Sequence, residues 1–315
     1  MPALPVVALT SPIHPDSHAR LAAACEVRVA ADASADALRA VVREAEGLIV
    51  RNHLPEDIFD HAPRLRAVVR HGVGLDMIPV ERATQRKILV ANLPGSNTTA
   101  VVEYCLGAML HLRRGLADMD ATLRVEGWAT ARAMADSGTE LRGTTCGIVG
   151  VGTIGAQLAS LAQALGMRTV GLTRRPDALP AGVQAVDKAA LMRESDVIVL
   201  CCPLTPQTRG LIDAEALALA KPTAILINVA RGPVVDTAAL ADALARHALG
   251  GAALDVHDVQ PLPAEAAIRR APRVLLTPHV AGSTATSMLR MSTGAVDDML
   301  RLLRGQAPSH PVNTF

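Results

Sequence analysis

Short aliphatic and β-branched runs alternate with helix-like stretches along the first 95 residues. Five runs have the length and composition of buried strands, at residues 6–9, 27–29, 48–50, 67–69 and 89–91. The stretches between them, at 17–24, 36–45, 55–61 and 79–85, have helical spacing. Repeated alternation of this kind predicts a parallel sheet covered by helices on both faces.

A second alternation begins near residue 145. Its expected strands are residues 146–149, 169–172, 197–200, 224–227, 252–254 and 274–276. Between the two alternations, Asn97 can cap a helix that runs to about residue 113, and a further helical stretch reaches about residue 125. Trp128 then lies in a polar, glycine-rich stretch. A last helical stretch, 285–304, is expected to return to the first unit, which predicts an α/β chain of two doubly wound parallel-sheet domains.

Composition agrees with this architecture. A length of 315 residues favours two domains, and half of the residues are hydrophobic while only 1% are aromatic. The core is therefore expected to consist of Ala, Val, Leu and Ile. Disorder, a collagen-like repeat and a disulfide-stabilised miniprotein are excluded. The net charge of +1 gives no electrostatic basis for binding nucleic acid or an anionic membrane.

Five cysteines form no CxxC pair, and we expect no metal site. Cys201 and Cys202 end an apolar run and are interpreted as small buried hydrophobic residues. The first ten residues lack a basic region, and no apolar run approaches 18 residues. These features predict a reduced, cytoplasmic protein.

A glycine motif follows the first strand of the second alternation, with the residues Gly150, Gly152, Thr153, Ile154 and Gly155. The first glycine permits a tight turn, the second lets the backbone approach a pyrophosphate, and the third lets the helix pack on the strand. The phosphate charge would then lie at a helix N-terminus. The motif predicts a dinucleotide site.

The next strand ends in Thr173, Arg174 and Arg175, where binders of NAD place an acidic residue. Two guanidinium groups could instead hold a 2′-phosphate. Alternatively, these side chains are simply solvated in an arginine-rich chain. The segment favours NADP(H), with NAD(H) as the other option.

Three further strands end in Arg231, Asp255 and His279. Ligands of open α/β sheets bind beyond the carboxyl ends of the strands, so these residues are expected to converge. An arginine can bind a carboxylate through two parallel hydrogen bonds, and a histidine can carry the proton that accompanies a hydride. These are the components of a 2-oxoacid reductase, although Asp255 could instead cap the following turn.

With these motifs together, the chain resembles the D-isomer-specific 2-hydroxyacid dehydrogenases. The likeness extends over nearly the whole chain and rests on residues 71–76, 102–103, Trp128, 150–155, 203–208, 228–236, 251–256 and 277–279. It implies a flavodoxin-like substrate domain, residues 1–98 and 285–315, with a Rossmann dinucleotide-binding domain, residues 99–284, inserted in it. It also implies a homodimer built through the second domain, around residues 101–125 and Trp128.

The resemblance implies roles for single residues. Arg231 would clamp the substrate carboxylate, which the N–H groups of Val73 and Gly74 would also bind, and His279 would be the acid and base. Asp255 would orient the nicotinamide carboxamide. Further cofactor contacts are implied at Pro203, Thr208, Val229 and Ala230. Asn52, with Arg51 and His53, is a candidate for substrate selection, and the pattern fits glyoxylate, hydroxypyruvate or a similar short 2-oxoacid. A phosphoglycerate dehydrogenase is an alternative, although residues 306–315 do not resemble the additional regulatory domain of many phosphoglycerate dehydrogenases.

One position departs from the family pattern. Where the family usually has a Glu paired with the catalytic His, this chain has Gln260, and a neutral amide supports a lower pKa for His279 than a carboxylate would. In one interpretation Gln260 orients His279, as a similar pair does in the related formate dehydrogenases. In another, Asp258, two residues earlier and on the same face if the strand continues, supplies the charge. The third option is a dinucleotide-sensing protein without turnover, like the related co-repressors.

Overall fold

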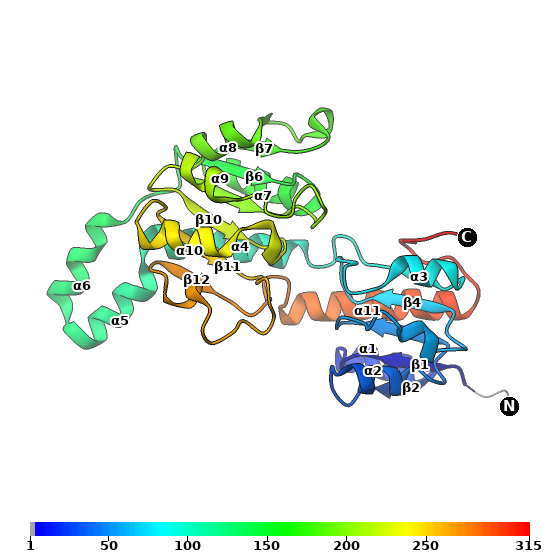
Figure 1. The fold of residues 1–315 in the computed structure, drawn as a ribbon. Helices are drawn as coiled ribbons and strands as arrows, with labels where there is room; N and C mark the ends of the chain where they lie inside the picture. Colours follow the sequence, from blue (N-terminus) through cyan, green and yellow to red (C-terminus); the bar gives the residue numbers. More distant parts are fainter. Residues whose placement is uncertain (1–3) are drawn as a thin grey trace. The chain divides into compact units, whose positions relative to one another are not determined.

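The computed structural model describes residues 4–315, which form two compact units (Figure 1). Unit 1 comprises residues 4–97 and 283–315, and unit 2 comprises residues 98–282. The chain therefore leaves unit 1 once and returns to it. Each unit has its own sheet and its own hydrophobic core.

Unit 1 contains a parallel five-stranded sheet in the order β2-β1-β3-β4-β5. This is the order of a flavodoxin-like doubly wound sheet. Its strands are β1 (Val6–Leu9), β2 (Glu26–Val29), β3 (Gly47–Val50), β4 (Ala67–Arg70) and β5 (Leu89–Ala91). Its helices are α1 (Pro15–Ala22), α2 (Ala35–Val41), α3 (Val80–Gln85) and α11 (Ala285–Leu303). One core contains residues of α1 and α11, and the other contains residues of α2 and α3, so both faces of the sheet are covered.

Unit 2 contains a parallel seven-stranded sheet in the order β12-β11-β10-β9-β6-β7-β8. Its strands are β6 (Thr145–Val149), β7 (Arg168–Leu172), β8 (Val183–Ala185), β9 (Val197–Leu200), β10 (Ile225–Asn228), β11 (Gly251–Leu254) and β12 (Val274–Leu276). Helices α4 (Thr98–Arg114) and α7 (Thr153–Ala164) contribute to one core, and α8 (Lys188–Glu194), α9 (Ala214–Leu219) and α10 (Thr237–Ala245) to the other. The predicted fold class, two doubly wound parallel sheets, is confirmed.

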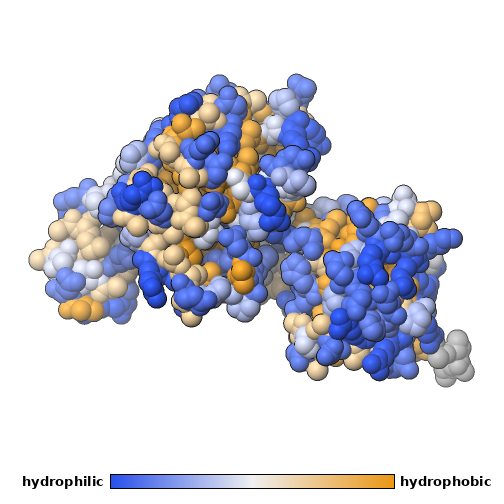
Figure 2. All heavy atoms as spheres, in the orientation of Figure 1, coloured by the Kyte–Doolittle hydropathy of each residue, from blue (hydrophilic) through white to orange (hydrophobic). Residues whose placement is uncertain are grey.

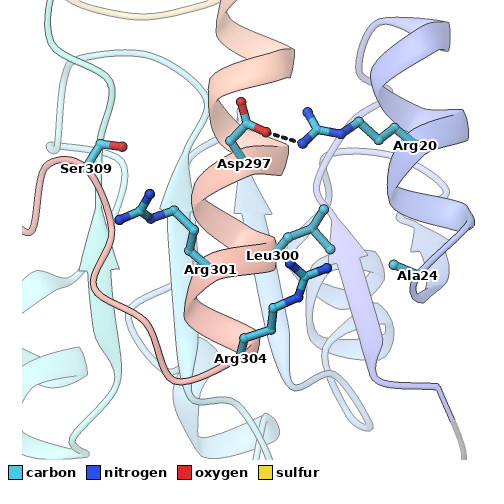
Figure 3. A pocket seen from close by; sticks show the side chains of 7 residues that line it. All are labelled: Arg20, Ala24, Asp297, Leu300, Arg301, Arg304 and Ser309. Carbon is cyan, nitrogen blue, oxygen red and sulfur yellow. Dashed lines mark ion pairs between the residues drawn. The ribbon is translucent and has the colours of Figure 1, made fainter.

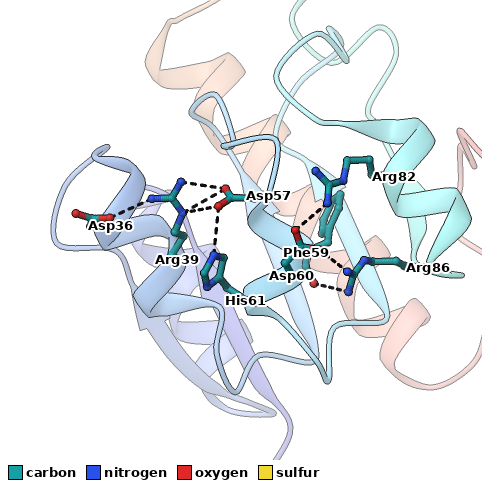
Figure 4. Close-up of polar contacts among 8 residues, drawn as sticks. All are labelled: Asp36, Arg39, Asp57, Phe59, Asp60, His61, Arg82 and Arg86. Carbon is teal, nitrogen blue, oxygen red and sulfur yellow. Dashed lines mark hydrogen bonds and ion pairs between the residues drawn. The ribbon is translucent and has the colours of Figure 1, made fainter.

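Residues 55–61 do not form the α-helix that their spacing predicts. They contain a single 3₁₀ turn, η1 (Ile58–His61), tied to its neighbours by arginines (Figure 4). Arg39 of α2 binds Asp57 at 3.0 Å, and Arg86 donates to a carbonyl inside the turn at 2.9 Å. Tertiary hydrogen bonds thus replace the next helical turn. Short 3₁₀ turns also occur at Ala135–Ser137, Pro176–Ala178, Gly232–Val234 and Ala267–Arg270.

Three other local expectations are corrected. The edge strand β8 was not predicted, because it has three residues of which only Val183 is buried. Trp128 begins helix α6 (Trp128–Met134), which follows α5 (Leu116–Glu126), instead of lying in a loop. The side-chain oxygen of Asn97 is buried without a hydrogen-bond partner, so this side chain does not cap α4. None of the helices in residues 4–315 combines the length and apolarity that crossing a bilayer requires.

Candidate active site

The glycine loop after β6 leaves space at the start of α7. A Cβ on Gly150, whose φ is +92°, would lie 2.6 Å from the Cα of Cys202, and a Cβ on Gly155 would lie 2.5 Å from the Gly150 carbonyl oxygen. Side chains are therefore excluded at both positions. A Cβ on Gly152 would meet no atom within 4 Å. The loop is thus closely packed at its two ends and open at its middle glycine.

The open position fits the pyrophosphate of a dinucleotide. Gly152 is the N-cap of α7 and supplies no side-chain cap, so the first N–H groups of the helix remain available to an anion. Cys201 stabilises the loop from behind, because its thiol donates to the Gly150 carbonyl at 3.2 Å. Burial raises the pKa of this thiol, which keeps it protonated and able to donate.

The segment after β7 exposes two arginines. The backbone N–H of Arg175 donates to the Thr173 hydroxyl at 3.2 Å, which turns the chain there. Arg174 and Arg175 are both exposed, and no hydrogen bond or ion pair of either guanidinium group is found within residues 4–315. Both groups are therefore accessible to a ligand.

Other predicted cofactor residues are used in holding their own loops. The Thr208 hydroxyl donates to the Pro203 carbonyl at 2.7 Å and accepts from the Thr205 N–H at 2.8 Å. After β10, the Val229 N–H donates to the Leu200 carbonyl at 3.2 Å. The Ala230 N–H likewise donates to the Asn228 side chain at 3.0 Å. These residues therefore shape the ends of β9 and β10.

The loop that carries Arg231 is fixed by side-chain hydrogen bonds to its carbonyls and by close backbone packing. The Asn228 amide donates to the Arg231 carbonyl at 3.0 Å, and Arg231 Nη1 donates to the Ala230 carbonyl at 2.7 Å. A Cβ on Gly232 would lie only 2.1 Å from the carbonyl carbon of His257. The Arg231 loop and the segment after β11 therefore pack backbone against backbone.

Asp255, only 1% exposed, binds the turn that follows β12. Its Oδ1 accepts from the Thr277 hydroxyl and from the Val280 N–H, both at 2.7 Å, and its Oδ2 accepts from the Ala281 N–H at 2.8 Å. Because Thr277 donates to the carboxylate, the Tyr104 hydroxyl, 2.7 Å from Thr277 Oγ1, is the donor in that contact. Asp255 therefore performs the turn-capping role considered as the alternative from the sequence.

This turn places His279 beside Gln260. The His279 N–H donates to the Asp255 carbonyl at 2.8 Å, and the residue has a φ of +58°. His279 Nδ1 lies 3.3 Å from Gln260 Oε1, while Gln260 Nε2 donates to the His257 carbonyl at 3.4 Å. Since the amide nitrogen faces a carbonyl, the amide oxygen is the acceptor for His279 Nδ1–H. In the neutral ring, Nε2 is then the atom that can accept a proton.

The strand register expected for Asp258 is absent. Strand β11 ends at Leu254, so Asp258 does not share a strand face with Gln260. Its carboxylate accepts the Thr237 hydroxyl at 2.7 Å, from the start of α10. The proposal that Asp258 substitutes for the usual glutamate by continuing the strand is therefore wrong.

In unit 1, the loop after β4 is held through its carbonyl groups. Arg70 Nε donates to the Gly74 carbonyl at 3.0 Å, and Arg70 Nη1 donates to the carbonyls of Val50 at 3.0 Å and His71 at 2.6 Å. The Asn92 amide donates to the Val73 carbonyl at 2.8 Å. Arg70 and Asn92 were not predicted as site residues, because nothing in their local pattern indicates these contacts.

His71 connects this loop to α11. It is 3% exposed, and its Nε2 lies 2.8 Å from the Ser292 hydroxyl, which also accepts the His14 N–H at 3.0 Å. The Ser292 hydroxyl therefore bridges His71 and the backbone of His14. Burial, with a smaller contribution from the charge of Arg51, lowers the pKa of His71 to about 3. The ring is therefore neutral.

The loop after β3 contains the candidate substrate residue Asn52. Its Oδ1 accepts from the Ser11 hydroxyl, and the N–H groups of Arg51 and Asn52 donate to Thr10 Oγ1 at 2.8 and 3.2 Å. The Arg51 guanidinium turns back to the Pro12 carbonyl. The carboxyl ends of β1, β3 and β4 share one edge of the sheet, so Asn52 and the Val73 loop lie at the same edge.

Comparisons with known proteins agree with this geometry. Residues 106–281 match the family model described as D-isomer specific 2-hydroxyacid dehydrogenase, NAD binding domain. The chain belongs to this family. The resemblance seen in the sequence is confirmed, and with it a Rossmann-type domain of nicotinamide-dependent oxidoreductases.

No group of three or more His, Cys, Asp or Glu side chains suited to a metal ion occurs among residues 4–315.

Relatives with the same sequence identity to this chain have different names. A D-3-phosphoglycerate dehydrogenase of Mycobacterium bovis is 37% identical over 98% of this chain, and a glyoxylate reductase of Aeropyrum pernix is 37% identical over 88% of this chain and 86% of its own length. This chain spans 59% of the phosphoglycerate dehydrogenase. Among solved structures, the NADPH-dependent glyoxylate/hydroxypyruvate reductase of Sinorhizobium meliloti, in complex with NADP and malonate, superposes with a TM-score of 0.87 and is 30% identical. The match covers 98% of this chain and 97% of the reductase.

Proposed function

We propose that the protein reduces a small 2-oxoacid, of the glyoxylate or hydroxypyruvate type, to its D-2-hydroxyacid with a nicotinamide cofactor. The observation that carries the proposal is the pair of His279 and Gln260, 3.3 Å apart, on a turn held by Asp255. The loop bearing Arg231 packs against the same segment. In this proposal His279 is the proton carrier and Arg231 the carboxylate ligand, and both follow strands of the same parallel sheet.

Each residue has a defined task in this proposal. The bound nicotinamide supplies hydride in reduction and accepts it in oxidation. Arg231 binds the substrate carboxylate, which the N–H groups of Val73 and Gly74 also bind. His279 Nε2 gives its proton to the carbonyl oxygen during reduction and removes the hydroxyl proton during oxidation. Asn52 contributes to substrate selection.

For the cofactor we favour NADP(H). Arg174 and Arg175 are exposed and have the chemistry to hold a 2′-phosphate, and the Sinorhizobium relative was solved with NADP. The matched family model is described as an NAD binding domain, so NAD(H) is the competing cofactor. Three hydrogen bonds occupy the carboxylate of Asp255, which leaves acceptor capacity for the nicotinamide carboxamide.

The direct test is oxidation of NADPH and NADH, followed by absorbance, with glyoxylate, hydroxypyruvate, pyruvate and 3-phosphohydroxypyruvate. We expect turnover with a short oxoacid, and we expect His279→Ala to lower kcat by about 10²–10⁴-fold. The exposed His310→Ala is the control and should leave kcat unchanged. A preference for the phosphorylated acid would support the phosphoglycerate dehydrogenase alternative instead.

The cofactor choice has its own variant. Arg174→Ala with Arg175→Ala should raise the KM for NADPH about tenfold or more, because each lost charge-assisted hydrogen bond to a phosphate weakens binding, and should leave the KM for NADH unchanged. Wild-type rates that are equal or better with NADH would overturn the NADP(H) assignment.

Gln260 distinguishes an active enzyme from a cofactor-sensing protein. If Gln260 orients His279, then Gln260→Glu adds a negative charge next to the ring and should move the His279 limb of the pH–rate profile to higher pH. An unchanged profile and unchanged turnover would contradict the orienting pair. A wild-type protein that binds dinucleotide but reduces no oxoacid would support the cofactor-sensing function. The observation that favours this alternative is the neutral Gln260 in place of the usual glutamate.

We further propose a homodimer that uses the α5–α6 segment. No residue of α5 is buried, Val125 is 85% exposed and Trp128 is 75% exposed. Figure 2 shows apolar residues at the surface of this segment, on the left of the view. Light scattering should give twice the chain mass, and Trp128→Glu should lower the measured mass toward that of one chain. A monomeric wild type would overturn the proposal.

The five free thiols support the expectation of a reducing, cytoplasmic location.

A further inference from the structure

Unit 1 has a surface cavity between α1, α11 and the C-terminal segment (Figure 3). Its volume is about 490 Å³. Leu300 and Arg301 of α11 line it together with Arg304, the C-cap residue of this helix, and Arg20 of α1. Asp297, Ala24 and Ser309 complete the lining. Three guanidinium groups therefore surround a cavity with a single carboxylate.

The positive charges of this cavity are only partly neutralised. Arg20 pairs with Asp297 at 2.5 Å. Arg301 uses its Nε to donate to the Ala307 carbonyl at 2.8 Å, which is an uncharged partner. For the Arg304 guanidinium, no hydrogen bond or ion pair is found within the described residues 4–315. Two of the three arginines thus lack a neutralising carboxylate, and their mutual repulsion favours an added anion.

The cavity lies at the opposite edge of the sheet from the Val73 loop. His71, after β4, contacts Ser292 in the first half of α11, while Arg66, before β4, donates to the carbonyl of Leu303 at the end of that helix at 2.9 Å. Helix α11 therefore runs from the carboxyl edge of β4 to its amino edge. The arginines in its last turns lie at the amino edge, away from the candidate substrate loops.

We propose that this cavity binds a small anion with at least two negative charges, carried by a phosphate group or by neighbouring carboxylates. Guanidinium groups bind the planar oxygen pairs of both groups through two parallel hydrogen bonds. The Ser309 hydroxyl lines the cavity but is not available to donate to a bound anion, because it already donates to Asp298 at 2.8 Å. The carbonyl end of α11 itself disfavours an anion, so binding depends on the arginine charges.

The anion would connect the end of α11 with the segment that follows it. Arg301 lies in the last turn of α11, Arg304 is the C-cap residue, and Ser309 lies beyond the helix. The same helix starts at Ala285, two residues after the chain re-enters unit 1 at Ser283. A ligand in the cavity therefore stabilises the far end of the helix that begins at this junction.

The test uses the full chain with saturating NADPH, so that the glycine loop is already filled. Inorganic phosphate and citrate are titrated at constant ionic strength set with potassium chloride, and binding is followed by calorimetry and by hydrogen exchange. We expect saturable binding, with slower exchange of the amides of residues 298–309. Arg301→Gln with Arg304→Gln should weaken binding at least about tenfold, as expected for the loss of charge-assisted hydrogen bonds.

The matched control is Arg43→Gln with Arg64→Gln, which removes two exposed arginines of unit 1 outside the cavity and should leave binding unchanged. Binding of both anions supports recognition by charge and shape, and binding of phosphate alone or citrate alone identifies the group preferred. The absence of saturable binding, or equal binding by the Arg301/Arg304 variant, would overturn the proposal. The readout does not need turnover, so a failure here is separate from a failure of the proposed reductase activity.

Discussion

The turn that carries His279 in unit 2 and the Val73 loop in unit 1 are stabilised by opposite kinds of groups. In unit 2, acceptor side chains such as Asp255 bind the N–H groups of the turn that carries His279. In unit 1, donor side chains, Arg70 and Asn92, bind the carbonyls of the Val73 loop. The His279 turn is thereby held through its N–H groups, whereas the Val73 loop is held through its carbonyls, and the N–H groups of Val73 and Gly74 have no hydrogen bond among residues 4–315.

The largest expected difference between the two edges concerns glycine. In Gly232→Ala, the new Cβ would lie 2.1 Å and 2.3 Å from backbone atoms of residues 257 and 258, so the backbone must move, and we expect a loss of about 3 kcal/mol or more in the free energy of unfolding. Gly72→Ala, with a φ of +138° and only the Arg70 side chain at 3.5 Å, should lose about 1–2 kcal/mol. Urea unfolding measures both. Equal losses would show that the two loops are equally tolerant.

The acceptor side of the comparison is tested by Asp255→Ala. Three donors, two of them backbone N–H groups, lose their partner in a buried site, and we expect a loss of about 2–3 kcal/mol in stability, with lower kcat because the His279 turn is released. Asp258→Ala, which removes one exposed hydrogen bond to Thr237, is the control and should cost less than about 1 kcal/mol. A similar loss in both variants would contradict the role of Asp255.

In unit 1, the buried imidazole of His71 predicts a pH dependence of stability. Its pKa is about 3 in the folded chain and near 6.5 when unfolded, so below about pH 6.5 the unfolded state binds a proton that the folded state does not. Stability therefore falls as pH decreases from about 6.5 toward 3, by at most about 1.4 kcal/mol per pH unit from this group. Urea midpoints between about pH 7.5 and 4.5 should show a shallower slope for His71→Gln. The exposed His310→Gln should keep the wild-type slope, and identical slopes for all three proteins would refute this account.

The smallest expected effect concerns the outer end of the Asp255 network. Burial raises the pKa of Tyr104 to about 12, so its hydroxyl remains a donor to Thr277 over the usable pH range. Tyr104→Phe removes this one hydrogen bond and should cost about 1 kcal/mol, while Thr277 still donates to Asp255. Urea unfolding would detect the change. A loss as large as that of Asp255→Ala would mean that the tyrosine, and not the carboxylate, organises the turn.

Features with a local sequence pattern could be predicted, whereas features that depend on tertiary contacts could not. The strands that form the centre of each sheet have continuous apolar runs, and the residues after β6 and β10 belong to local motifs, so their placement follows from spacing. Strand β8 lacks such a run, and the 3₁₀ turn at Ile58–His61 depends on Arg39 of α2 and on Arg86, the C-cap residue of α3. Arg70 and Asn92 act on carbonyls that only the folded sheet brings near them. Contacts of this kind leave no local pattern in the sequence.

Helix α5 has a consequence for how the chain folds. It has 11 residues, none of them buried, and glycines with positive φ at both ends. An isolated helix of this length is marginally stable in water. If the proposed homodimer forms through this segment, its helicity should depend on protein concentration, because association would cover its apolar side chains. Dilution, followed by limited proteolysis near Gly115 and Gly127, would make the segment a local indicator of assembly.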